Sequence, residues 1–439
     1  MTSMFKFVKR TALGAKVPHE KNTAAKASVQ IVCPAEVVIA MQQHIGAPAK
    51  PCVAKGDNVY VGTLIGEAGG FVSANMHSSV SGTVAEITEL LFANGARVPA
   101  VRITADGEQT PDPSLAPPEV TDYASFVAAV RNSGLVGLGG AGFPTDVKLS
   151  PKSLDALDTL VINGAECEPY ITADSREFLE CSSTLMSGIL AVQKYLNIKK
   201  VIIAIERNKP EAIDLMCSLV KGDASIHVKP LDSRYPQGAE KVLIEKTTGR
   251  EVPRGKLPAD VGVLVLNVTT VSTIGKYLNT GMPLVQKRIT VDGDAVKTPK
   301  NVIVPIGTSL ESVIKFCGGY TKEPGKIITG GPMMGVSVVD AAFPLLKQNN
   351  AILVFSKEKA VLPEPGPCIR CGRCVAACPM GLSPVEITSA FSHQSVDELT
   401  SLQVDCCIGC GTCSFVCPAK RLVTQKVNLA KAFEKNGKK

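Results

Sequence analysis

The N-terminal part of the chain alternates short apolar runs with turn residues. Apolar and β-branched residues gather in 29–32, 56–61, 63–65 and 81–87, and segments containing glycine or proline separate these runs. Short runs bounded by turn residues are typical of β-strands. We therefore expect a small all-β domain within residues 1–110.

The pattern changes after a Pro-rich join at 111–118. A helix is predicted at 121–134, and further apolar runs then alternate with amphipathic segments. The predicted strands are 160–162, 200–205, 226–228 and 261–266, and the predicted helices are 178–196, 211–220 and 239–247. This alternation predicts a mostly parallel sheet with helices on both faces, in a domain spanning 119–285.

Composition and charge limit the function classes. The 439 residues are 45% hydrophobic and 20% charged, which fits an ordinary globular protein of several domains. Residues 1–10 lack the apolar core of a signal peptide, and no apolar run has the length of a membrane span, so we expect a cytoplasmic chain. The basic segment 426–439 is expected to be a solvated tail, or else a contact for an anionic membrane or acidic partner. No aromatic residues interleave with its basic ones, which disfavours nucleic acid.

Two related cysteine runs lie near the C-terminal end, within a domain expected at 360–425. Both have the spacing C-x2-C-x2-C-x3-C-P. In bacterial ferredoxins, three thiolates of such a run hold one [4Fe-4S] cluster and the fourth reaches the other cluster. We therefore predict a helical, ferredoxin-type domain with two clusters, one held by Cys368, Cys371, Cys374 and Cys417, and the other by Cys407, Cys410, Cys413 and Cys378.

Zinc and disulfides are the alternatives for these cysteines. Structural zinc sites usually pair two C-x2-C units, and disulfides need an oxidising compartment. Cys406 has no place in the repeated spacing and is expected to be a packed thiol.

A glycine-dense loop and several strand ends form a second candidate site. The loop runs from Gly137 to Gly142 and continues through Phe143 to Lys148. Such a loop exposes backbone amides and lets a phosphate or planar ring approach closely. Asn163, Glu166 and Glu168 follow a predicted strand, at the edge where open α/β sheets bind ligands. The loop by itself would be interpreted as a tight turn. Only its combination with Asn163, Glu166 and Glu168 favours a cofactor site.

These residues resemble known families. The segments 137–145, 163–169 and 237–240 are similar to the flavin-binding, NADH-oxidising subunit of respiratory complex I, and more closely to the RnfC component of the Rnf complex, an ion-translocating ferredoxin:NAD oxidoreductase. The resemblance covers nearly the whole chain. Segments 53–62 and 79–84 resemble a lipoyl-like sandwich without its carrier lysine, and 286–345 resembles a β-grasp (SLBB) module.

The resemblance implies an FMN site. Its floor would be Gly137, Gly139, Gly140 and Gly142, with Lys148 near the flavin or its phosphate. Asn163 and Glu166 would contact the isoalloxazine, and Asn267 and Thr270 would lie near the phosphate. The chain lacks the flavinylation motif of covalent flavin subunits, so FMN is expected to be noncovalent.

The resemblance also implies a site for NAD(H) as substrate. Phe143 and Glu168 would face the nicotinamide nucleotide, with Gly238 and Glu240 nearby. The expected fold is an α/β multidomain chain with a lipoyl-like sandwich, a Rossmann-like FMN/NADH domain, a β-grasp module and a two-cluster ferredoxin domain.

The expected function is an electron-input subunit on the cytoplasmic face of the membrane. Its expected partners are other Rnf subunits, especially an iron-sulfur subunit, and ultimately ferredoxin. One alternative is a cobalamin (corrin) reductase of the propanediol-utilisation type, which would carry its sandwich domain after the glycine loop. A noncatalytic iron-sulfur scaffold is the other alternative.

Overall fold

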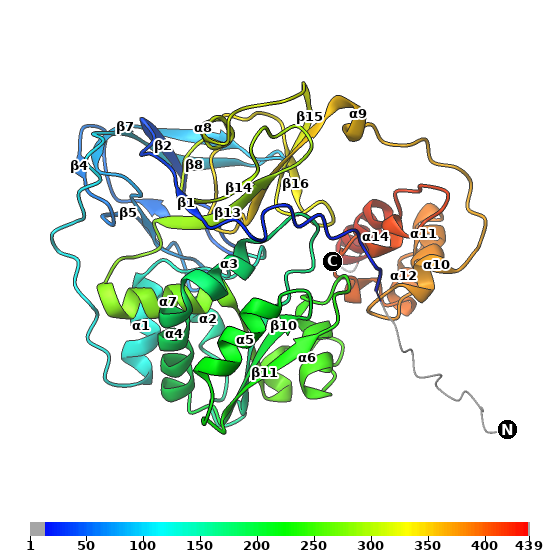
Figure 1. Ribbon diagram of the computed structural model, residues 1–439. Helices are drawn as coiled ribbons and strands as arrows, with labels where there is room; N and C mark the ends of the chain where they lie inside the picture. The colour runs from blue at the N-terminus through cyan, green and yellow to red at the C-terminus, as the bar shows by residue number, and fades with distance from the viewer. Residues whose placement is uncertain (1–13, 438–439) are drawn as a thin grey trace.

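A computed structural model describes residues 14–437 (Figure 1). A β-sandwich, a parallel α/β domain, a mixed-sheet domain and a helical cysteine-rich domain follow one another along the chain. The expected multidomain fold is therefore confirmed. No helix in this range is both long and apolar enough to cross a membrane.

Two small antiparallel sheets form the sandwich, in the orders β2-β8-β7-β4 and β3-β5-β6. Val37, Ile39, Val101 and Ile103 alternate along β2 and β8 and are buried, because successive side chains of a strand point to opposite faces. The strands are β2 (Glu36–Ala40), β3 (Lys50–Pro51), β4 (Asn58–Val59), β5 (Leu64–Glu67), β6 (Met76–His77), β7 (Gly82–Leu91) and β8 (Arg97–Ala105).

The α/β domain has a four-stranded parallel sheet in the order β11-β10-β9-β12. Leu160 and Ile162 of β9 share a core with α4 and α7, while Val161 packs with α6, so helices cover both faces. The helix predicted at 178–196 is two helices, because the backbone leaves the helical region at Cys181. The elements are α1 (Tyr123–Asn132), α2 (Thr145–Lys148), β9 (Thr159–Gly164), α3 (Ala173–Glu180), α4 (Ser182–Tyr195), β10 (Lys200–Glu206), α5 (Pro210–Leu219), β11 (Ile226–Leu231), α6 (Glu240–Thr248), η1 (Pro258–Val261), β12 (Val263–Asn267) and α7 (Val268–Thr280).

The third part is a six-stranded sheet in the order β1-β14-β13-β17-β15-β16, with α8 packed on it. Two of its strands lie outside the expected range 286–345, namely β1 near the N-terminus and β17, which is central. We call this sheet and α8 the β-grasp domain. Its elements are β1 (Val29–Gln30), β13 (Gln286–Asp292), β14 (Lys300–Pro305), α8 (Leu310–Phe316), β15 (Pro324–Thr329), β16 (Val336–Val338) and β17 (Ala351–Ser356), followed by α9 (Lys357–Ala360).

In the cysteine-rich domain each cysteine run leads through a short helix to a longer one. Figure 1 shows this domain set apart from the sheets, after a long connection from α9. Helix α14 extends past residue 425 and packs through Val427, Ala430 and Glu434, so the described part of the expected basic tail is helical; residues 438–439 lie outside the described range. The helices are α10 (Arg373–Ala376), α11 (Pro384–Ser392), α12 (Val396–Ser401), η2 (Val404–Cys406), α13 (Thr412–Phe415) and α14 (Val423–Gly437).

Residues 14–31 form a strap across three of these parts. The Gly14 amide donates to the Ala377 carbonyl of the cysteine-rich domain, and Ala15 exchanges two backbone hydrogen bonds with Tyr235 of the α/β domain. The strap ends as β1, which pairs in parallel with β14.

Candidate cofactor cavity and cysteine sites

A cavity of about 2460 Å³ lies at the carboxyl ends of β9 and β12, the edge where open α/β sheets bind ligands. Residues from all four parts of the chain line it. Each predicted cofactor residue except Gly142 is in its wall, and these are Gly137, Gly139, Gly140, Phe143, Lys148, Asn163, Glu166, Glu168, Gly238, Glu240, Asn267 and Thr270.

The glycine loop folds back on itself at the cavity. The Gly137 amide donates to the Phe143 carbonyl at 2.8 Å, and the Gly142 amide donates to the Gly137 carbonyl at 3.2 Å. Gly140 has φ of +113° and open space around it, so it can present its backbone to a ligand. Gly142 instead accepts from the Ile45 amide, and so joins the loop to the sandwich.

The N-terminus of α7 faces this loop. Asn267 caps the helix, with its Oδ1 accepting from the Thr269 and Thr270 amides. A Cβ on Gly139 would lie 3.3 Å from Asn267 Nδ2, so glycine permits the close approach of loop and helix. The Thr269 and Thr270 amides are thus used by the cap, but the dipole at the N-terminus of α7 still favours an anion such as the phosphate of FMN.

Three further contacts fix the cavity wall beside β9. Asn163 Nδ2 donates to the Gly238 carbonyl at 2.9 Å. A Cβ on Gly238 would lie 2.5 Å from the Ala165 carbonyl oxygen, so a larger residue there would push the two segments apart. Lys148 forms an ion pair with Glu240, which holds α2 against the start of α6.

Glu166 is a buried acid in the cavity wall. Its Oε1 accepts from the Asp174 amide at 2.7 Å, while its buried Oε2 has no partner among the described residues. Burial raises the pKa of Glu166 to about 7, and Lys21 and Lys209 oppose this only in part. A buried, unpartnered oxygen beside a cavity fits a polar ligand group such as a flavin ring edge.

Glu168 joins the cavity to the β-grasp domain. Its two carboxylate oxygens accept from the Met333 and Met334 amides at 3.0 Å each. Burial raises its pKa to about 7 as well. Next to it, the Tyr235 hydroxyl donates to the Cys410 carbonyl at 2.6 Å, so the cavity wall touches the cysteine-rich domain.

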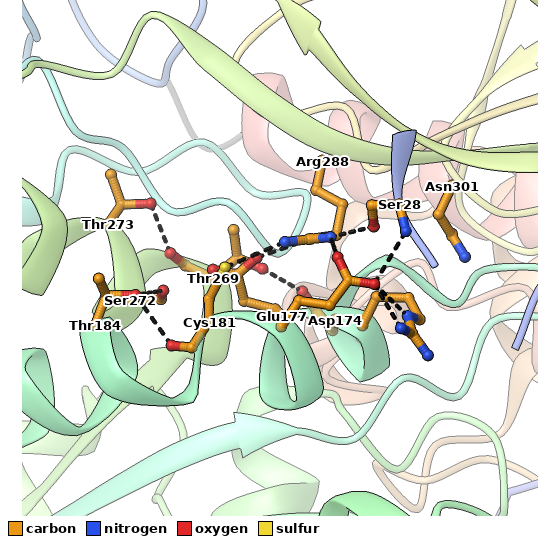
Figure 2. A network of polar contacts seen from close by, with 12 residues as sticks. Ser28, Asp174, Glu177, Cys181, Thr184, Thr269, Ser272, Thr273, Arg288 and Asn301 are labelled. Carbon is orange, nitrogen blue, oxygen red and sulfur yellow. Dashed lines mark hydrogen bonds and ion pairs between the residues drawn. The ribbon is translucent and has the colours of Figure 1, made fainter. Parts of the chain in front are cut away.

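Sequence reasoning missed four residues that support this site. Lys21 of the strap donates to the carbonyls of Glu166, Glu168 and Ile171, and Lys287 of β13 donates to the Leu138 carbonyl. Asp174 accepts from Asn267 Nδ2 and Thr269 Oγ1 at 2.7 Å each. Figure 2 shows Arg288 reaching from β13 to Glu177, beside Asp174 and Thr269. These contacts join distant segments, so no local pattern signals them.

One predicted cluster site encloses a small cavity. Cys378, Cys407, Cys410 and Cys413, the four residues predicted to share a cluster, all line a space of about 20 Å³. The Gly409 amide donates to Cys407 Sγ at 3.4 Å, and the hydroxyls of Thr412 and Thr424 lie near Cys410 Sγ and Cys413 Sγ. Polar hydrogens directed at sulfur suit thiolate ligands of a cluster. We call this group the inner cysteine site.

The second set is more open. Cys368 and Cys371 are exposed, whereas Cys374 and Cys417 are half-buried. Gly366 bonds to Ala419, which brings the two segments of this outer cysteine site together. In residues 14–437 no three His, Cys, Asp or Glu side chains are already arranged around a metal ion. Cys406 does not line the inner cavity.

Family models match four successive segments. They are the RnfC barrel sandwich hybrid domain at residues 9–108, the Nuo51 FMN-binding domain at 130–276, the SLBB domain at 288–337 and the 4Fe-4S dicluster domain at 367–421. The chain therefore combines an FMN-binding domain with an iron-sulfur domain, and the sandwich precedes the glycine loop.

Relatives match across most of the chain. It is 42% identical over 392 residues to the C subunit of the Na⁺-translocating ferredoxin:NAD⁺ oxidoreductase complex of Acetobacterium woodii, covering 88% of each chain. It is 43% identical to the C subunit of the proton-translocating ferredoxin:NAD⁺ oxidoreductase complex of Clostridium ljungdahlii, covering 83% of this chain and 80% of that protein.

A solved structure has a related fold. An NAD⁺-reducing [NiFe]-hydrogenase in its H₂-reduced state aligns with a TM-score of 0.50 at 18% identity, over 71% of this chain and 63% of the hydrogenase chain. From its domains and its relatives, the chain belongs to the RnfC family, the C subunits of ion-translocating ferredoxin:NAD⁺ oxidoreductase complexes.

Proposed function

We propose that this chain exchanges hydride with NAD(H) through noncovalent FMN, and single electrons through two [4Fe-4S] clusters, as the electron-input and electron-output subunit of a membrane-bound Rnf complex. FMN takes up two electrons as hydride and releases them singly, which is the chemistry it supplies when bound. The observation that carries the proposal is Tyr235, which lines the cofactor cavity and also bonds to Cys410 of the inner cysteine site.

The residues around the cavity have distinct tasks in this proposal. Asn267, Thr270 and the amides near Gly139 would hold the phosphate, and Asn163 and Glu166 would hold the ring. Gly137, Gly140 and Gly142 shape the loop, and Lys148 stabilises the wall through Glu240. No side chain has to act as a general acid or base for hydride exchange, so these residues bind, orient and exclude water.

The nicotinamide nucleotide would enter on the side of Phe143, Glu168, Gly238 and Glu240. Glu168 already uses both oxygens for backbone amides. Its task is therefore to hold the 331–335 loop at the cavity edge. Phe143, which lines the cavity beside the glycine loop, is the apolar surface available to a nicotinamide ring.

Electrons would leave the cavity through the inner cysteine site and reach partners through the exposed outer site. The proposed partners are other subunits of the complex, above all an iron-sulfur subunit, with ferredoxin as the ultimate redox partner. The chain would lie peripherally on the cytoplasmic face of the membrane, held by those subunits.

The test is an anaerobic NADH titration of the chain loaded with FMN and clusters, followed by absorbance and low-temperature EPR. Bleaching of the flavin band together with reduced-cluster signals is expected. Cys410→Ser should lose the inner-cluster signal, whereas Cys217→Ser, an exposed thiol outside both sites, should match the unaltered chain. Clusters that form without FMN binding or any NADH response would refute the proposal.

A further inference from the structure

Lys287 is a buried cation that bonds to the glycine loop of the cofactor cavity. Its side chain lies on β13 and is only 4% exposed, and its Nζ donates to the Leu138 carbonyl at 2.8 Å. A lysine ammonium has three N–H groups to donate. No carboxylate of the described residues lies within the 4.0 Å of an ion pair with it.

This contact clamps the start of the glycine loop. The Leu138 amide donates to Thr270 Oγ1 at 3.0 Å, while the Leu138 carbonyl accepts from Lys287. Leu138 is therefore held at its amide by Thr270 of α7 and at its carbonyl by Lys287 of β13. The position of the loop relative to the helix N-terminus depends on both contacts.

The carboxylates of Asp174 and Glu177, which are near Lys287, form hydrogen bonds or ion pairs with other residues. Asp174 accepts from Asn267 and Thr269, and Glu177 pairs with Arg288 at 3.0 Å (Figure 2). Arg288 pairs with Glu180 as well. A buried charge without a direct counterion is costly, so the Lys287 ammonium is placed where an added anion would stabilise it.

We propose that Lys287 is a positioning residue for the cofactor, which fixes the glycine loop through Leu138 and supplies the buried positive charge opposite the phosphate held at the N-terminus of α7. This inference rests on the proposed function, because it takes that phosphate to be part of FMN. Neither the glycine loop nor the helix cap contains this lysine, which comes from the β-grasp domain.

Binding of the phosphate near Lys287 has a protonic consequence. Burial lowers the pKa of Lys287 to about 7, and Asp174 and Glu177 on α3 oppose this in part. A phosphate dianion nearby raises that pKa again. Above pH 7, FMN binding therefore takes up a proton at Lys287. Glu166 and Glu168, with pKa values near 7, take up protons in the same direction, so a control must separate them.

Riboflavin is that control, because it has the ring of FMN without the phosphate. Isothermal titration calorimetry of the full chain at pH 7.5, in buffers of different ionisation enthalpy, gives the protons taken up per ligand. We expect roughly half a proton or more from Lys287 with FMN, and much less with riboflavin. Lys287→Arg keeps the charge at every pH and should lose this uptake.

The affinity for FMN provides the second readout. Between pH 7 and 9 the affinity of the unaltered chain for FMN should fall by up to about tenfold per pH unit, whereas the affinity of Lys287→Arg should stay constant. Lys287→Met should bind FMN at least about tenfold more weakly at pH 7, with riboflavin affected less.

Three outcomes would overturn the inference: equal uptake with FMN and riboflavin, unchanged uptake in Lys287→Arg, or equal FMN affinity in the Arg and Met variants. The first two do not need the Met variant to fold. If the unaltered chain binds no FMN at all, both the proposed function and this inference are wrong. If FMN binds but the Lys287 variants bind it in the same way as the unaltered chain, only this inference is wrong.

Discussion

The α/β domain is joined to its two neighbours in different ways. Buried charges and amides join it to the β-grasp domain, through Arg288 with Glu177 and through Glu168 with the 333–334 amides. The cysteine-rich domain is joined by the Tyr235 hydroxyl, an Arg254–Asp405 ion pair that is 40% exposed on both sides, and the strap. The first joint supplies much of the cavity wall, whereas the second adds little to that wall and connects it to the inner cysteine site.

The largest expected effect is at the buried joint. Arg288→Met should lower the free energy of unfolding by about 3–5 kcal/mol, because it leaves Glu177 buried without its partner. Urea unfolding measures this. The matched control is Arg97→Met, whose pair with Glu89 is long and exposed. Equal effects of the two variants would contradict the contrast between the joints.

Glu166→Gln tests the electrostatics of the cavity built by that joint. The pKa of Glu166 rises from 4.5 to about 7 on folding, so the folded chain binds this proton more tightly than the unfolded chain. The unfolding free energy of the FMN-free chain should therefore fall between pH 4.5 and 7, by up to about 3 kcal/mol for this group. In Glu166→Gln the amide oxygen keeps the Oε1 contact, and an NH₂ group that does not titrate replaces Oε2. The dependence of the unfolding free energy on pH that Glu166 causes should therefore vanish. If the unfolding free energy of Glu166→Gln depends on pH as strongly as that of the unaltered chain between pH 4.5 and 7, the prediction is wrong.

Tyr235→Phe tests the joint to the cysteine-rich domain. Loss of the hydroxyl should cost about 1 kcal/mol of stability, while flavin bleaching by NADH should keep its rate and cluster reduction should slow. Stopped-flow absorbance with freeze-quench EPR separates the two steps. Tyr320→Phe, at a partly exposed ring away from the cavity, is the control. Slowing of both steps alike would show that Tyr235 acts on the cavity instead.

The smallest effect is expected for Arg254→Ala. Its pair with Asp405 is half open to solvent, so its loss should change the unfolding free energy by about 0–1 kcal/mol and be masked by salt. If thermal unfolding shows a larger loss of unfolding free energy, the joint to the cysteine-rich domain depends on ion pairs as strongly as the joint to the β-grasp domain.

Local patterns predicted the four strands of the α/β sheet and the glycine loop, because each is encoded within a few residues. They missed β2 and β8 of the sandwich, and they assigned 29–32 to that domain although β1 pairs with β14 of the β-grasp sheet. Cys378 could be grouped with Cys407, Cys410 and Cys413 because the ferredoxin repeat carries that exchange in its spacing. Lys287 could not be found in this way, since it meets Leu138 from 149 residues away. Gly142 belongs to the predicted glycine loop, but its carbonyl accepts a hydrogen bond from Ile45 of the sandwich. The number and spacing of glycines in the loop do not predict that contact.

The strap has a consequence for biosynthesis. Residues 14–31 are synthesised before their partners, which include Tyr235, the 302–303 segment and Ala377. These contacts of the strap can therefore form only after residue 377 has been synthesised. The strap is thus a segment whose full set of contacts depends on three separately folded parts, so weakening the Ala15–Tyr235 contact should slow the assembly of those parts more than it slows the folding of each.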